Sequence, residues 1–126
     1  MGIKVVIRDC LGAVLASCSK KIPHVFTSLE VKALAVVTAL SFATELGFNK
    51  AILEGDSMEV IQALIQTEST LSSIGPSIDD SKALAADFDQ LQYSHVRGEC
   101  NRIAHSLTRY VIDMTYFIVW MEDVLP

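Results

Sequence analysis

Two acidic residues stand where carboxylates commonly carry out chemistry. Glu30 lies near the start of the longest predicted helix, and Asp56 follows the short apolar run Ala51–Glu54. Sites of open α/β sheets usually lie at the carboxyl ends of strands. Two such carboxylates can hold Mg²⁺, a hard cation that prefers oxygen ligands. Two metal ions about 4 Å apart can then clamp the attacking and leaving oxygens of a phosphodiester.

Each carboxylate also has a structural explanation. Residues 27–30, Thr-Ser-Leu-Glu, form a capping-box pattern in which Glu30 satisfies a backbone donor at the start of the helix. Asp56 or Ser57 can cap the helix that follows. The histidines show no HxxxH or HExxH spacing, and the chain has no GxSxG, Walker A or GxGxxG motif. Spacing alone therefore leaves both explanations of Glu30 and Asp56 open.

The length and charge of the chain limit the classes of protein it can belong to. Its 126 residues predict a single domain, residues 1–126. The 15 acidic residues outnumber the 10 basic ones, which argues against strong nonspecific binding to nucleic acid. The longest apolar runs are shorter than a bilayer-spanning helix, and no signal peptide is visible, so no membrane association is expected.

Cysteine usage indicates a reducing compartment. The three cysteines, Cys10, Cys18 and Cys100, are an odd number and have no CxxC spacing. A disulfide framework or a zinc site is therefore not expected, and we predict an intracellular protein of the nucleus or cytoplasm.

The predicted elements alternate between strands and helices. Apolar and β-branched runs at 3–9 and 13–17 predict a hairpin, followed by a polar connection over 18–27. Helical spacing predicts helices from Thr27 to Gly47, after Ser57, from Pro76 and from Asn101. Strands are expected at 51–54 and 90–96, and residues 113–126 form an apolar C-terminal tail. This order predicts an α/β fold in which helices cover a mixed sheet.

Four blocks of sequence resemble the plant RNase H-like domains related to retroelement reverse-transcriptase-associated ribonuclease H. They are IKVVIRDCLGAVLAS, SLEVKALAVVTALSFATELGF, AILEGDSMEVIQAL and HVRGECNRIAHSLTRY, and they occur in the family's order over nearly the whole chain. The late segment VWMEDV resembles the tail of plant members. The resemblance implies a five-stranded mixed sheet and cleavage of the RNA strand of an RNA–DNA hybrid, with Mg²⁺ or Mn²⁺ as cofactor.

The resemblance assigns a site residue by residue. Family members use four carboxylates, of which Glu30 matches the one on the first helix and Asp56 the one after the fourth strand. His105 stands where the last-helix Asp is expected, and imidazole suits Mg²⁺ poorly. The first-strand Asp, which contacts both metals in the family, has no counterpart, because residues 3–9 match the family's second strand. By this resemblance, the N-terminal strand is missing.

A missing central strand leaves a gap in the predicted sheet. Unpaired backbone groups along such a gap are costly when they are buried. The segment Tyr116–Val119 has high β propensity. We therefore expect this segment, or a strand from a second copy, to fill the gap, and strand exchange or a homo-oligomer to be accessible.

Three functions remain open at this stage. The first is an RNase H-like domain that binds RNA–DNA hybrid with its ribonuclease activity lost or impaired. In this reading Arg97, Asn101 and Arg102 contact the nucleic acid. The second is a protein-interaction module that associates with itself. The third is an active metal-dependent hybrid ribonuclease that obtains its missing carboxylate from an upstream segment.

Overall fold

The chain folds around a five-stranded mixed sheet. The computed structural model describes residues 2–23, 25–96 and 116–123. In chain order the elements are β1 (Gly2–Arg8), β2 (Val14–Lys21), α1 (Ser28–Glu45), β3 (Lys50–Gly55), α2 (Met58–Ile65), α3 (Gly75–Ala85), β4 (Gln90–His95) and β5 (Tyr116–Asp123). Within the described residues, no helix combines the length and apolar character needed to cross a bilayer.

The N-terminal hairpin forms where the sequence predicts it. Asp9 accepts hydrogen bonds at Oδ1 from the backbone N–H groups of Leu11 (2.9 Å) and Ala13 (2.8 Å), and Gly12 supplies the positive φ of 89°. The carboxylate of Asp9 therefore holds the turn. The strand after the turn is longer than predicted, because β2 continues to Lys21 where we expected a polar connection. Its alternating polar residues suit an edge strand with one face in solvent.

Helix α1 carries the largest share of the buried helical surface. Its buried face is built from small and β-branched residues (Val31, Ala33, Ala35, Val36, Ala39, Leu40 and Ala43). The helix ends as predicted at Gly47, which has a φ of 85°. The N–H of Gly47 donates to the Thr44 carbonyl (3.1 Å) and that of Phe48 to the Ala43 carbonyl (3.0 Å), a Schellman motif.

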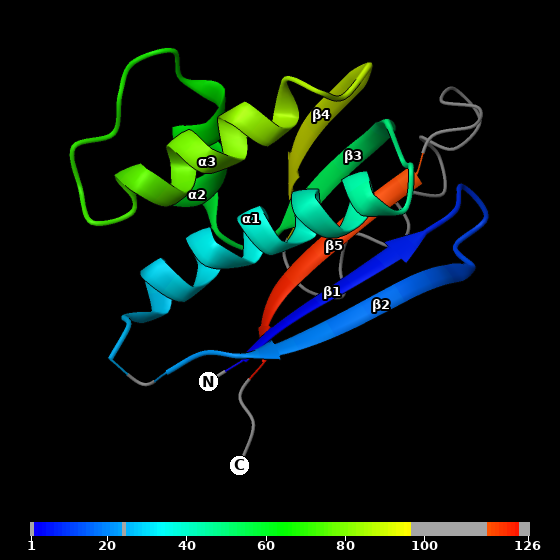
Figure 1. Ribbon diagram of the computed structural model, residues 1–126, viewed down its shortest axis with the longest axis horizontal. Coiled ribbons are helices and arrows are strands. Elements are labelled where there is room, and N and C mark those ends of the chain that lie inside the picture. The colour runs from blue at the N-terminus through cyan, green and yellow to red at the C-terminus, as the bar shows by residue number, and fades with distance from the viewer. Residues whose placement is uncertain (1, 24, 97–115, 124–126) are drawn as a thin grey trace.

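The C-terminal strand lies inside the sheet. The strand order is β2-β1-β5-β3-β4, so the last strand in sequence occupies the central position. β5 pairs antiparallel with β1 and parallel with β3 (Figure 1). The expectation that Tyr116–Val119 fills a gap between these two strands is thus confirmed, although the strand extends to Asp123. Residues 116–123 are a sheet strand and not a tail, and the described sheet has no gap.

The two faces of the sheet differ in what covers them. Figure 1 shows α1, α2 and α3 together on one face. The core there includes Val5, Leu53, Ile118 and Trp120, which pack against the buried side of α1. Buried side chains on the other face include Val6, Ile52 and Phe117, together with the carboxyl of Glu54. The start of β1 and the carboxyl ends of β2, β3 and β5 lie at the same end of the sheet.

Candidate functional site

Glu30 and Asp56 lie at the same end of the sheet. Four residues connect α1 to β3, so the helix and strand run in opposite directions and the first turn of α1 faces the end of β3. The fold thus brings both predicted carboxylates to one end. Among the described residues, however, no group of three or more His, Cys, Asp or Glu side chains is arranged to hold a metal ion.

Glu30 is used to begin α1. Its Oε1 accepts a hydrogen bond from the Thr27 N–H (2.8 Å), and the Thr27 hydroxyl accepts one from the Glu30 N–H (3.2 Å). This is the capping box that the sequence predicts, so the structural explanation of Glu30 is confirmed. One carboxylate oxygen of Glu30 is therefore already engaged in a local hydrogen bond.

Asp56 is exposed and does not cap the helix after it. The N-cap of α2 is Ser57, whose hydroxyl accepts a hydrogen bond from the Val60 N–H (3.3 Å). The Asp56 carbonyl oxygen accepts one from Nε2–H of His95 (3.1 Å), and the Val96 N–H donates to the Gly55 carbonyl (2.9 Å). The turn after β3 is thus fixed to the end of β4, and the Asp56 side chain projects from an anchored backbone.

His95 is the residue at this site whose role the sequence did not reveal. It is half-buried at the end of β4, and its backbone is paired with Gly55. The contact between His95 and Asp56 depends on the parallel register of β3 and β4, which are separated by two helices in the sequence. Local sequence patterns carry no signal for such a pairing.

An apolar side chain of the neighbouring strand lies against Gly55, the residue before Asp56. β3 and β5 pair in parallel up to Glu54 and Val119, so the next position along β5, opposite Gly55, is Trp120. The Trp120 indole is 1% exposed and lies over Gly55, where an added Cβ would collide with the ring. Its Nε1–H has no hydrogen-bond acceptor among the described atoms. The side chains of β5 from Tyr116 to Met121 include no carboxylate.

This donor set does not fit a pair of divalent metal ions. Two-metal catalysis requires several oxygen ligands that bridge and flank the ions. Of the four carboxylates that the resemblance implies, the described residues supply two, Glu30, with one oxygen in a capping bond, and Asp56. β5 ends in Glu122 and Asp123, whose backbones pair with Ile3 and Gly2. His105, Arg97, Asn101 and Arg102 lie outside the described residues.

A cluster of lysines lies at the same end of the sheet. β1 begins and β2 ends there, with Gly2 paired to Lys21, Ile3 to Lys20 and Lys4 to Ser19. The side chains of Lys4, Lys20 and Lys21 are exposed. We call these three residues the lysine cluster. It places positive charge beside the end where β3 finishes, in a chain whose overall charge is −5.

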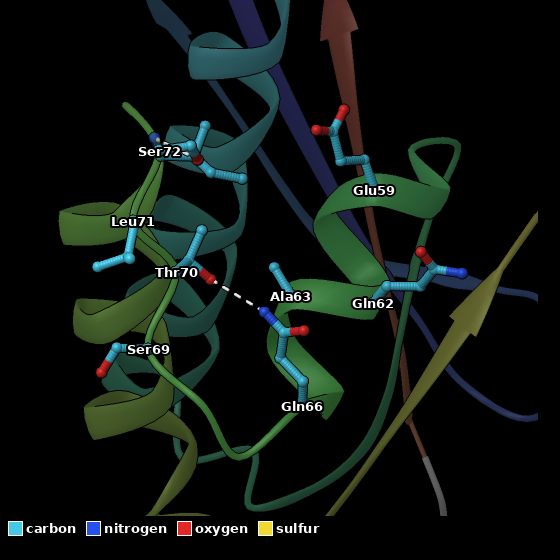
Figure 2. A pocket seen from close by; sticks show the side chains of 9 residues that line it. Glu59, Gln62, Ala63, Gln66, Ser69, Thr70, Leu71 and Ser72 are labelled. Atoms are coloured by element: carbon cyan, nitrogen blue, oxygen red, sulfur yellow. Dashed lines mark hydrogen bonds between the residues drawn. The ribbon is translucent and has the colours of Figure 1, made fainter.

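A cavity in the described part of the molecule lies away from both carboxylates. It has a volume of about 450 Å³, is open to solvent and is formed by α2 and the loop after it. Figure 2 shows Gln62 of α2 and Gln66, the residue that caps the C-terminus of α2, at its edge, with Gln66 Nε2 donating to the hydroxyl of Thr70 in the loop (3.3 Å). Neither Glu30 nor Asp56 lines it, so the cavity and the carboxylates are separate features.

Comparisons with known proteins identify the fold. The reverse transcriptase-like family matches residues 2–111. The structure of RNase H1 from the halophilic archaeon Halobacterium salinarum NRC-1 superposes with a TM-score of 0.72 at 22% identity, covering 87% of this chain and 85% of that chain. The N-terminal RNase H domain of a Mycobacterium tuberculosis protein, fused to maltose-binding protein, superposes with a TM-score of 0.66 at 16% identity, covering 86% and 94%.

No curated protein sequence matches the chain. The matched range of the family stops before β5, so the strand that completes this sheet lies outside it. The mixed sheet and its helices nevertheless agree with the two RNase H structures. The chain therefore belongs to the reverse transcriptase-like family and has the RNase H-like fold.

Proposed function

We propose that this protein binds RNA–DNA hybrid at the lysine end of the sheet and does not cleave it efficiently. Family membership and the RNase H-like fold support a nucleic-acid ligand. The observation that carries the second half of the proposal is Trp120, an apolar side chain on β5 that lies against Gly55, the residue before Asp56. Glu30 and Asp56 would need a carboxylate at this position of β5 to share metal ions with it.

The lysine cluster supplies the positive charge for binding. Contacts to phosphate oxygens position a protein on nucleic acid and supply most of its nonspecific affinity. Lys4 and Lys21 are exposed on the same face of paired strands and are diagonal neighbours, so they can reach one stretch of backbone together, whereas Lys20 projects from the other face. We extend the interface to Arg97, Asn101 and Arg102 on the basis of the sequence resemblance. Lysines on an edge strand also have a second role, because they hinder association with other strands. The test of the proposed surface is therefore a direct measurement of hybrid binding.

A matched pair of variants tests the binding surface. Lys4→Ala/Lys21→Ala should weaken binding to a labelled RNA–DNA hybrid and lower the slope of log K against log salt by about one per lysine, because each phosphate contact releases a counterion. Lys50→Ala is the control, because Lys50 is exposed at the start of β3, at the opposite end of the sheet. Equal losses in both variants, or no binding by the unaltered protein, would refute the proposed surface.

A cleavage assay tests the second half of the proposal. The unaltered protein, Glu30→Gln and His105→Asp are incubated with labelled hybrid in Mg²⁺ and in Mn²⁺, the metals used if the site is active. We expect no turnover by the unaltered protein. Cleavage that is abolished in Glu30→Gln would instead establish an active metal-dependent ribonuclease.

A protein-interaction role is the second candidate. Leu71, in the loop after α2, is 97% exposed, and Ile65 at the end of α2 is 61% exposed. These apolar side chains belong to the same α2–loop region as the cavity, and exposed apolar surface of this kind commonly marks contacts with other proteins. Absence of hybrid binding would favour this role.

We also propose an intracellular location, in the nucleus or cytoplasm. The Cys10 and Cys18 thiols are free, as a reducing compartment would keep them. The sequence blocks support a plant, retroelement-derived origin.

A further inference from the structure

The position of β5 makes the sheet depend on the end of the chain. All seven residues of β1 pair with β5, and four residues of β3 pair with it from the other side. If β5 were withdrawn, β1 and β3 would each present an open edge of backbone donors and acceptors, which acts as a template for another strand. We call the space between these two edges the β1–β3 slot.

The β1–β3 slot is specific for the side chains of β5. Phe117 is 4% exposed, Ile118 is fully buried and Trp120 is 1% exposed. Burial of these apolar side chains stabilises the sheet. Gly55 leaves the room that the Trp120 ring occupies, since a Cβ there would collide with it. The slot therefore recognises the sequence Tyr116–Asp123, whichever copy of the chain supplies it.

The chain between β4 and β5 is long enough to reach another molecule. Residues 97–115 separate the two strands in sequence. Extended at about 3.3–3.6 Å per residue, a segment of this length spans roughly 65 Å. Exchange of an identical terminal element between copies preserves every strand pairing and is a low-cost route to a dimer.

We propose that the β1–β3 slot accepts the Tyr116–Asp123 strand of a second copy, which forms a strand-exchanged dimer. The chain's own β5 is present at an effective concentration in the millimolar range. In dilute solution it therefore occupies the slot in preference to the β5 of a second copy. Exchange takes place while the chain folds, when the slot of one copy meets the β5 of another. The fraction of dimer is thus set by the protein concentration during folding, and the buried strand then leaves the slot slowly.

A disulfide between β1 and β5 reports which copy supplies the strand. Val6 and Val119 are register partners, and paired residues of antiparallel strands have Cα separations that suit a disulfide. Val6→Cys/Val119→Cys is made together with Cys10→Ser, Cys18→Ser and Cys100→Ser. The protein is refolded from denaturant at two concentrations about a hundredfold apart, oxidised after folding and resolved on a non-reducing gel. We expect intrachain disulfides in the dilute sample and covalent dimers in the concentrated one.

The control uses a pair that exchange cannot separate. Val5 is the register partner of the native Cys18 within the β1–β2 hairpin. Val5→Cys together with Cys10→Ser and Cys100→Ser should form only intrachain disulfides at both concentrations. Covalent dimers in this control would mean that the crosslinks report random association, and the proposal would then fail.

Light scattering on the unaltered protein provides a measurement free of substitutions. The protein refolded at high concentration should contain a dimer that persists after dilution, whereas the protein refolded at low concentration should be monomeric. Monomer in both samples would overturn the proposal, as would a β1–β5 disulfide that forms only within one chain. Neither measurement depends on nucleic acid, so failure here leaves the proposed hybrid binding intact.

Discussion

Glu54 is a carboxyl group in the interior of β3. It is 2% exposed, and burial raises its pKa from 4.5 to about 7, while the Arg8 guanidinium acts in the opposite direction. Because the folded state holds this proton more tightly than the unfolded state, the residue lowers stability once the unfolded chain has lost its proton. The penalty is absent below pH 4.5, grows between pH 4.5 and 7 and is complete above pH 7.

Glu54→Gln should therefore change the pH dependence of stability. A shift of one pKa unit corresponds to 1.36 kcal/mol, so the free energy of unfolding of the variant should rise by about 3 kcal/mol relative to that of the unaltered protein as the pH rises through this interval. Urea denaturation below pH 4.5 and above pH 7 measures the difference. Parallel stability curves for the two proteins would contradict a raised pKa at Glu54.

Single residues of the site differ in how far the sequence revealed them. Thr27 and Glu30 were predicted as a capping box because the pattern is local, and the hydrogen bonds confirm it. Trp120 could not be placed over Gly55, because that contact depends on the register of two strands that are distant in sequence. The hydrogen bond from His95 to the Asp56 carbonyl was not predicted for the same reason, because it depends on the register of β3 and β4.

At the scale of elements, the packing of β5 against β3 depends on a single small residue. Gly55 ends β3 and lies beneath the Trp120 indole. The requirement is steric, since this glycine leaves room for a large ring from the next strand. A protein interior is close-packed, so even one added methyl group there must displace either the ring or the backbone.

Gly55→Ala should destabilise the protein by about 1–3 kcal/mol, the usual cost of overpacking a core. Chemical denaturation measures this loss. The same substitution in a Trp120→Leu background is the matched control, because the smaller side chain removes the collision and should reduce the cost of the alanine. An unchanged cost in that background would show that the indole is not the cause.

Predictions of the elements were accurate where periodicity and caps are strong. The start of α1 at its capping box and its end at Gly47 both follow from local signals. β2 was predicted too short, because its Ser and Lys residues resemble a polar loop, whereas they line an exposed edge strand. Residues 113–126 were interpreted as an apolar tail from which Tyr116–Val119 fills the gap in the sheet; the β propensity of that segment predicted the strand, but not its extension to Asp123.

At the scale of the whole molecule, removal of β5 should abolish the fold. A chain that ends at residue 115 leaves the β1–β3 slot open, with backbone groups unpaired on both edges. We expect it to lack a cooperative thermal transition in circular dichroism. Added peptide of the sequence Tyr116–Asp123 should restore the transition, whereas the same peptide with Ile118→Pro should not, since proline cannot donate to the ladder. A cooperative transition without peptide would refute this dependence.

The central position of β5 also governs the rate of folding. Gly2 pairs with Asp123 and Arg8 with Phe117, so one ladder joins the two ends of the chain. Ladders with such long sequence separation raise the contact order. Folding slows because the chain loses the entropy of loop closure before the contacts form. During synthesis β1 is made well before its partner β5. The sheet is therefore completed only once β5 has been made, and until then the nascent chain carries two unsatisfied edges that chaperones can bind.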